Sequence, residues 1–252
     1  MQISSPLLSE NGGVTDMLCM NNVSVDIQGS PILRSISVEI DRGELVALVG
    51  RNGAGKTTSF KSIMGFLRPR AGSISYDGKT ISGLDPYQIA RRGIAYSPEE
   101  SDVFGDLTVE ENIEFPTWTR QTKKSHAERI DRAYKLFPKL TQYRQRGGLQ
   151  LSGGERKMVS IARAIVLDAP MLLLDEPFEG LSPAIIPTIA EGISSIRSLG
   201  YSILMAESNV HHLPDYVDRI YVIERGEVIF SGPLKLAMSD SKVRRIIEGE
   251  VE

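Results

Sequence analysis

The stretch that decides the fold of this 252-residue chain is Gly50-Arg51-Asn52-Gly53-Ala54-Gly55-Lys56-Thr57-Thr58. It follows the pattern Gly, any four residues, Gly-Lys, Ser or Thr. It lies between an apolar run at 45–49 and apolar residues at helical spacing from 60 to 64. Glycines let backbone amides converge on an anion, and the N-terminus of the following helix adds about half a positive charge. The stretch therefore predicts a phosphate-binding loop that joins a buried strand to a helix.

The side chains at the end of this loop suit a nucleoside triphosphate. Lys56 would place a positive charge on the β- and γ-phosphates, and the Thr57 hydroxyl would bind Mg²⁺. We expect the remaining residues of the loop, from Gly50 through Thr58, to cradle ATP. ATP and Mg²⁺ are therefore the predicted substrate and cofactor.

A second apolar run ends in two carboxylates: Met171-Leu172-Leu173-Leu174-Asp175-Glu176. The end of a parallel strand faces the ligand crevice of an open α/β sheet. We expect Asp175 to hold Mg²⁺ through its water shell, because Mg²⁺ seldom sheds all its waters. Glu176 is the predicted general base for the attacking water, a role typically worth about 10²–10⁴ in rate.

A third motif is Leu151-Ser152-Gly153-Gly154-Glu155, which precedes a helix. Ser152 and Glu155 form a capping box, which explains the motif on structural grounds alone. Two successive glycines are costly at a helix start, and they make sense where a phosphate approaches the helix N-terminus closely. Both explanations stay open at the level of these five residues.

Together the three motifs resemble the ATP-binding cassette (ABC) family, over nearly all of the chain from about residue 18 to 233. The resemblance implies an α/β fold with a P-loop NTPase (RecA-like) core, an antiparallel β subdomain and a small helical subdomain. It also implies a dimer in which Ser152, Gly153 and Gly154 contact the γ-phosphate held by the other subunit.

Three further segments are similar to the ATPases of branched-chain amino acid importers, in particular the shorter of that system's two ATPases: residues 106–112, 175–183 and 206–209. This implies a non-identical second ATPase subunit, two transmembrane permease subunits and, indirectly, a solute-binding protein. The chain would then lie peripherally on the cytoplasmic face of a bacterial plasma membrane. Two alternatives stay open: the ATPase of a lipid or lipopolysaccharide exporter, and a nucleotide-gated scaffold paired with a more active sister.

Four positions depart from the general pattern of the family. Ile27 stands where an aromatic residue would stack on adenine, and it can still pack apolar atoms on the base. Glu99 replaces a glutamine and is a candidate Mg²⁺ ligand. Ser182 replaces an aspartate, and Ser208 replaces the switch histidine that contacts the γ-phosphate, which leaves Ser208 a minor catalytic role. Glu99 and the missing histidine look typical of the importer branch, whereas lipopolysaccharide-export ATPases generally keep the histidine.

Histidines 211 and 212 follow Ser208 by about one turn. We expect them to be surface residues at a helix start rather than replacements for the missing histidine.

Composition excludes several classes of protein. The formal net charge of -3 gives no basic excess for binding nucleic acid. The longest apolar runs are too short to cross a bilayer, so any link to a membrane would run through a partner. Cys19, the single cysteine, cannot form an internal disulfide and is expected to be a small apolar residue of an early strand.

The pattern along the chain predicts its organisation. Residues 1–16 are expected to be a flexible tail, 17–238 the ATPase domain with a helical insertion at about 101–150, and 239–252 a C-terminal helix and tail. The pattern from Lys235 to the end predicts one continuous terminal helix. Alternation from 18 to 40 predicts strands, and Asp77-Gly78 and Arg225-Gly226 predict hairpins. Thr108 with Glu111, and Ser125 with Glu128, predict two helix starts (capping boxes).

Overall fold

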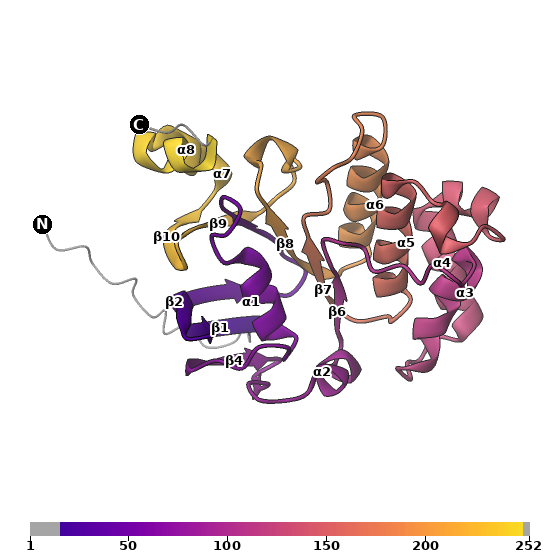
Figure 1. Cartoon of the computed structure of the whole chain (residues 1–252), viewed down its shortest axis with the longest axis horizontal. Helices are drawn as coiled ribbons and strands as arrows, with labels where there is room; N and C mark the ends of the chain where they lie inside the picture. The colour runs from indigo at the N-terminus through magenta and orange to yellow at the C-terminus, as the bar shows by residue number, and fades with distance from the viewer. Residues whose placement is uncertain (1–15, 249–252) are drawn as a thin grey trace, which may run out of the picture.

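The computed structural model describes residues 16–248. Figure 1 shows two sheets with helices packed around them. The strands are β1 Leu18–Ile27, β2 Ser30–Ile40, β3 Leu45–Val49, β4 Ala71–Tyr76, β5 Lys79–Thr80, β6 Ile94–Ser97, β7 Met171–Asp175, β8 Ser202–Glu207, β9 Arg219–Glu224 and β10 Glu227–Gly232. The α-helices are α1 Lys56–Ile63, α2 Pro86–Arg92, α3 Val109–Glu114, α4 His126–Leu136, α5 Gly153–Ile165, α6 Ile186–Ser198, α7 Leu234–Ser239 and α8 Ser241–Glu248. Four 3₁₀ helices are η1 Phe115–Trp118, η2 Pro138–Tyr143, η3 Gly148–Gln150 and η4 Val210–His212.

The larger sheet has the strand order β10-β9-β3-β8-β7-β6. Strand β3 runs parallel to β8 and β9, and β7 runs parallel to β6 and β8. In the register of these pairs Val49 lies opposite Glu207, and Asp175 lies opposite Ala206. The phosphate loop and the acidic strand end therefore emerge at the same end of the sheet, separated by the one strand β8.

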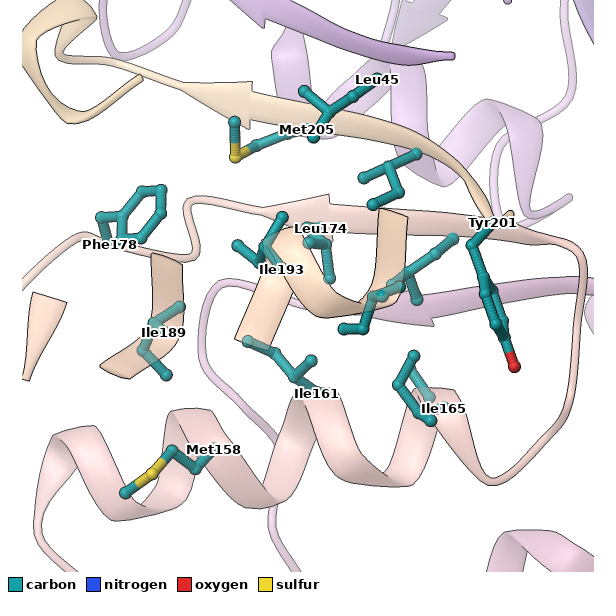
Figure 2. Close-up of a cluster of buried hydrophobic side chains, with 14 of the residues drawn as sticks. Leu45, Met158, Ile161, Ile165, Leu174, Phe178, Ile189, Ile193, Tyr201 and Met205 are labelled. Atoms are coloured by element: carbon teal, nitrogen blue, oxygen red, sulfur yellow. The ribbon is translucent and has the colours of Figure 1, made fainter. Parts of the chain in front are cut away.

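Strands β3, β7 and β8 are buried on both faces, which is why they are almost continuously apolar in sequence. Alternate residues of β3 enter different cores: Val46 and Leu48 pack with α1 and the smaller sheet, and Leu45 packs with α5 and α6. Figure 2 shows this second core, in which Met205 and Leu174 from the strands face Ile161 and other side chains of the covering helices.

The smaller sheet is antiparallel, in the order β2-β1-β4-β5. Its hairpin at Asp77-Gly78 and the β9–β10 hairpin at Arg225-Gly226 confirm both hairpin predictions. Cys19 lies in β1 and is partly exposed, as a strand residue rather than part of the core. The antiparallel β subdomain expected beside the parallel core is thus present.

The segment between β6 and α5 is helical, as predicted, and lies beyond α5 at one end of the molecule (Figure 1). Thr108 caps α3 and Ser125 caps α4, and both capping boxes are complete. The fully buried Arg129 of α4 ties this segment to the end of α5, because its guanidinium donates to the carbonyls of Thr117, Arg120 and Val166. These bonds fix how the helical segment lies against the core.

The prediction of one C-terminal helix was wrong: the chain forms α7 and α8 with a break at Asp240. Asp240 has extended backbone angles, and its Oδ1 accepts hydrogen bonds from the amides of Lys242 and Val243. An aspartate that caps the following turn in this way ends one helix and starts the next.

Residues 1–15 of the expected tail, and 249–252 at the other end, lie outside the described residues. Within 16–248, no helix is long and apolar enough to cross a membrane.

Candidate functional site

The phosphate loop has the conformation that its glycines predict. A Cβ added to Gly50 would lie 2.3 Å from the carbonyl oxygen of Ile223, so no other residue fits there without a backbone shift. Gly55 has a φ of 117° and caps α1, a conformation that side chains rarely adopt. The loop thus turns tightly from β3 into α1 and presents the helix N-terminus.

Lys56 is buried inside this loop, only 5% exposed. Its Nζ donates to the carbonyl of Gly50 at 2.7 Å and lies 3.1 Å from Oε1 of Glu176. The loop lysine and the predicted general base therefore form a buried ion pair that the sequence alone did not predict.

Thr57 and Asp175 come together as predicted for a metal site. The Thr57 hydroxyl donates to Oδ1 of Asp175 at 3.3 Å, and the hydroxyl of Tyr96 donates to Oδ2 at 3.0 Å. Burial raises the pKa of Asp175, and the hydrogen bonds from Tyr96 and Thr57 oppose that shift. A hydroxyl and a carboxylate at this spacing are oxygen ligands of the kind that Mg²⁺ prefers, so the residues fit the implied cation.

Glu176 follows Asp175 in a turn with a φ of 47°. Its amide donates to the carbonyl of Ala206, and its Oε2 accepts from both the amide and the hydroxyl of Ser208, at 3.0 and 3.2 Å. One carboxylate oxygen thus pairs with Lys56 and the other with Ser208. The Ser208 hydroxyl thus contacts the predicted base, and the minor catalytic role of Ser208 stays a prediction.

Glu207, which none of the sequence motifs singled out, is fully buried at the end of β8. Its Oε1 accepts from the amide of Phe178 at 3.2 Å, and its Oε2 lies 3.6 Å from Nδ1 of His212. Burial, and then the nearby charge of Glu176, raise the pKa of Glu207 to about 9. The sequence does contain a signal for Glu207, because this residue ends an apolar strand just as Asp175 does.

His211 is exposed, as predicted, and His212 is not simply a surface residue. Its ring packs edge-to-face on Phe178 at 6.3 Å and faces Glu207. His212 is thus packed against Phe178 and Glu207, the residues next to the site of Glu176.

Glu99 lies in the loop after β6 and is exposed. Burial of part of its side chain, and then the charges of Glu179 and Asp175, raise its pKa. Lys157 of α5, which the sequence did not single out, donates from Nζ to the carbonyl of Glu99 at 2.8 Å. No contact in the described part of the chain joins the Glu99 carboxylate to Thr57 or Asp175, so its role as a metal ligand stays a prediction.

The other predicted nucleotide contacts differ in how exposed they are. Ile27 ends β1 and is 37% exposed, which leaves its side chain available to a base. Arg51, Asn52 and Gly53 are exposed, Ala54 is buried and Thr58 is half-buried.

The third motif lies at the N-terminus of α5, where Ser152 and Glu155 form the predicted capping box. Gly154 has a structural reason, because an added Cβ would lie 2.9 Å from Cγ2 of Ile185. An added Cβ at Gly153 would meet nothing within 4 Å. Among residues 16–248, no hydrogen bond or ion pair joins Ser152, Gly153 or Gly154 to the phosphate loop. Gly153 therefore faces space that another molecule can enter.

A glycine-rich loop with a buried lysine, a hydroxyl beside an aspartate, and a glutamate directly after that aspartate at a strand end define a P-loop nucleoside triphosphatase. The family model described as ABC transporter matches residues 33–179, more than half of the chain. The chain therefore belongs to the ABC transporter family, as an ATP-hydrolysing subunit whose hydrolysis is coupled to transport.

Similar proteins include ATPases of two kinds of transport system. The chain is 38% identical to the high-affinity branched-chain amino acid transport ATP-binding protein BraG of Pseudomonas aeruginosa, over 90% of this chain and 97% of that protein. It is 35% identical to the lipopolysaccharide export system ATP-binding protein LptB of Haemophilus influenzae, over 93% and 98%. A crystal structure of an ABC transporter's ATP-binding cassette in its ADP conformation matches with a TM-score of 0.80 and 25% identity, over 92% of this chain and 98% of that one.

Proposed function

We propose that this chain powers an importer of branched-chain or other amino acids, or of related small solutes, through two partner permease subunits. The observation that carries the proposal is Ser208, which stands where lipopolysaccharide-export ATPases generally have a histidine and whose hydroxyl binds Glu176 instead. The likeness to BraG supports this choice, as does 36% identity to the probable branched-chain amino acid transport ATP-binding protein LivF of Archaeoglobus fulgidus.

The buried Lys56–Glu176 pair indicates how ATP would prepare the site for hydrolysis. A triphosphate in the loop would attract the Lys56 ammonium more strongly than one carboxylate does, because it carries more negative charge. Release of Lys56 frees Oε1 of Glu176 to accept a proton from the attacking water, while Ser208 holds Oε2 in place. Mg²⁺, held from Thr57 and Asp175, supplies neutralising charge on the phosphates when bound.

The second half of the site would come from another ATPase subunit. Ser152 and Gly153 lie at the start of α5, away from every contact with the phosphate loop of their own chain, and the N-terminus of α5 favours an anion. We propose that they contact the γ-phosphate held by a partner cassette. Gly154, which packs against Ile185, would hold the start of α5 in place for this contact. An isolated copy of this chain would then hydrolyse ATP slowly.

The groove for the membrane subunits lies where the core meets the helical segment. Its volume is about 540 Å³, and its walls come from α2, β6, η1 and α5. Asp102 lines the groove, and Phe104 packs edge-to-face on the lining residue Phe115. We propose that a short helix of a permease subunit binds here. Charged and aromatic lining residues include Tyr87, Arg91, Tyr96, Asp102, Phe115 and Arg163.

The groove is tested by charge reversal at Glu100 and Asp102, both exposed. The double variant Glu100→Lys/Asp102→Lys should uncouple solute uptake from hydrolysis and leave ATP binding by the isolated subunit intact. Asp131→Lys on the outer face of α4 makes the same kind of charge change away from the groove and should behave as wild type. Unchanged uptake in the double variant would mean that the acidic loop is only a solvated surface.

The transported solute is tested by deletion of the gene and complementation. Uptake of labelled leucine, isoleucine and valine should fall in the deletion strain and return with the wild-type gene but not with Glu176→Gln. Normal amino acid uptake with lost delivery of lipopolysaccharide to the cell surface would favour the exporter function that the LptB likeness suggests. Full uptake with Glu176→Gln would favour the nucleotide-gated scaffold.

A further inference from the structure

Tyr96 connects two parts of the molecule that lie far apart in the sequence. It is the third residue of the edge strand β6, and it pairs with Leu173, two positions before Asp175 on β7. Its half-buried ring lines the groove at the junction with the helical segment. One side chain therefore faces the groove and reaches the acidic strand end.

The hydroxyl of Tyr96 helps to fix the orientation of Asp175. It donates to Oδ2 at 3.0 Å while the Thr57 hydroxyl donates to Oδ1 at 3.3 Å, so each carboxylate oxygen has one donor. Without this hydroxyl, Oδ2 would lose its only hydrogen bond to the described part of the chain.

The ring of Tyr96 also contacts the helix that follows the phosphate loop. It packs edge-to-face on the fully buried Phe60 of α1, with ring centroids 6.2 Å apart and planes at 80°. A displacement of this ring from the groove side would therefore act on both Asp175 and α1.

We propose that Tyr96 is a positioning residue that couples the groove to the metal site: its ring contacts the occupant of the groove, and its hydroxyl orients Asp175. The coupling rests on the proposed function, which places a permease helix in the groove. The orientation of Asp175 does not, so the two parts can be tested separately.

Orientation is tested with Tyr96→Phe in the full chain, which removes only the hydroxyl. Mn²⁺ replaces Mg²⁺ as the probe, and its binding in the presence of a non-hydrolysable ATP analogue is followed by electron paramagnetic resonance. The half-saturating Mn²⁺ concentration should rise about tenfold, the effect of losing one hydrogen bond to a charged group. Binding of the same analogue in EDTA should not change, because the phosphate loop is intact.

Tyr76→Phe is the matched control. It also removes a buried tyrosine hydroxyl, one that donates to the carbonyl of Gly93 at 3.0 Å and lies outside the groove and the site. Its Mn²⁺ titration should match wild type even if its melting temperature falls. An unchanged Mn²⁺ titration in Tyr96→Phe, or an equal shift in both variants, would overturn the positioning role.

Coupling is tested in the assembled transporter by the ratio of solute-stimulated to basal ATPase activity at saturating Mg²⁺. Tyr96→Phe should lower this ratio severalfold, and Tyr76→Phe should not. A Mn²⁺ shift with an unchanged ratio would overturn the coupling and keep the orientation of Asp175. If Glu100→Lys/Asp102→Lys also leaves uptake unchanged, then the proposed occupant of the groove is wrong, and the Mn²⁺ result still stands.

Discussion

At the scale of single residues, the site is organised around Glu176. Its two oxygens are divided between Lys56 and Ser208, and its backbone is held by β8 through Ala206. The contacts with Lys56 and with Ser208 support separate predictions, because the ion pair must break for catalysis whereas the contact with Ser208 can persist.

Glu176→Gln should retain ATP binding and nearly abolish turnover, and so trap a closed dimer. The amide cannot accept the proton from water, and it also releases Lys56 from its ion pair, so ATP affinity should rise rather than fall. Steady-state phosphate release by the assembled transporter and nucleotide binding by the isolated chain are the two measurements. More than about a tenth of the wild-type rate would reject Glu176 as the base.

Ser208→Ala should slow hydrolysis by less than tenfold, which is under about 1.4 kcal/mol of transition-state stabilisation. The amide of Ser208 keeps its 3.0 Å bond to Glu176 when the hydroxyl is removed, so the base stays oriented. The measurement is kcat at saturating ATP. A loss of several hundredfold would make Ser208 a principal catalytic contact and contradict the mechanism proposed above.

Glu207→Gln should make the protein more stable at alkaline pH. The pKa of Glu207 is about 9 in the folded chain and ordinarily 4.5, so between these values the folded state binds a proton that the unfolded state has released. Stability of the wild type therefore falls as pH rises through this window, and glutamine removes the effect. Other titratable groups near Glu207 are Glu176, Glu179, His212 and Lys157.

Urea unfolding at pH 6 and pH 8 measures this difference. The gain in unfolding free energy from Glu207→Gln should be larger at pH 8 than at pH 6 by about 1–3 kcal/mol. Equal gains at the two pH values would show that Glu207 is not protonated in the folded chain.

At the scale of elements, the start of α5 combines a structural glycine with one that the chain itself does not require. Gly154 packs against Ile185 of the segment before α6, whereas Gly153 faces open space. The capping box forms as predicted, and the close approach of a phosphate to Gly153 stays a prediction.

The two glycines should respond in opposite ways to alanine. Gly153→Ala should leave the fold as stable or stabilise it by up to about 1 kcal/mol, because alanine favours helix, and should reduce ATPase activity of the assembled transporter more than tenfold. Gly154→Ala should destabilise the chain by about 1–3 kcal/mol through the contact with Ile185. Thermal unfolding and ATPase assays on both variants test this. Full activity in Gly153→Ala would contradict the phosphate contact across the dimer.

At the scale of the whole molecule, three separate regions carry the proposed contacts. In the proposal above, the loop binds nucleotide, the start of α5 faces a second cassette, and the groove receives a membrane subunit. Their separation allows one partner to be altered without loss of the others.

We predict that the second cassette is a longer, non-identical ATPase. The prediction rests on the similarity of this chain to the shorter of two ATPases in branched-chain amino acid importers. Co-expression with the permease subunits and the candidate sister, followed by native mass spectrometry, should find one copy of each ATPase. A stable, active complex with two copies of this chain and no sister would contradict it.

The sequence by itself determined the P-loop class, the strand that precedes the loop, the acidic end of β7, the capped helices and both hairpins. Each of these is a local signal: a motif, a periodicity or a cap within about a dozen residues. Local signals gave a wrong prediction at the C-terminus, where a continuous helical pattern predicts one helix and the chain forms two, with a break at Asp240.

Only the tertiary structure decided which of these segments meet. Sheet register brings Thr57 to Asp175 across 118 positions and Tyr96 to Asp175 across 79. The pairing of Lys56 with Glu176, the burial of Glu207 against His212, and the contact of Gly154 with Ile185 arise in the same way. A side chain's partners depend on the order of strands and on packing between layers. Neither can be predicted from the spacing of residues along one strand or helix.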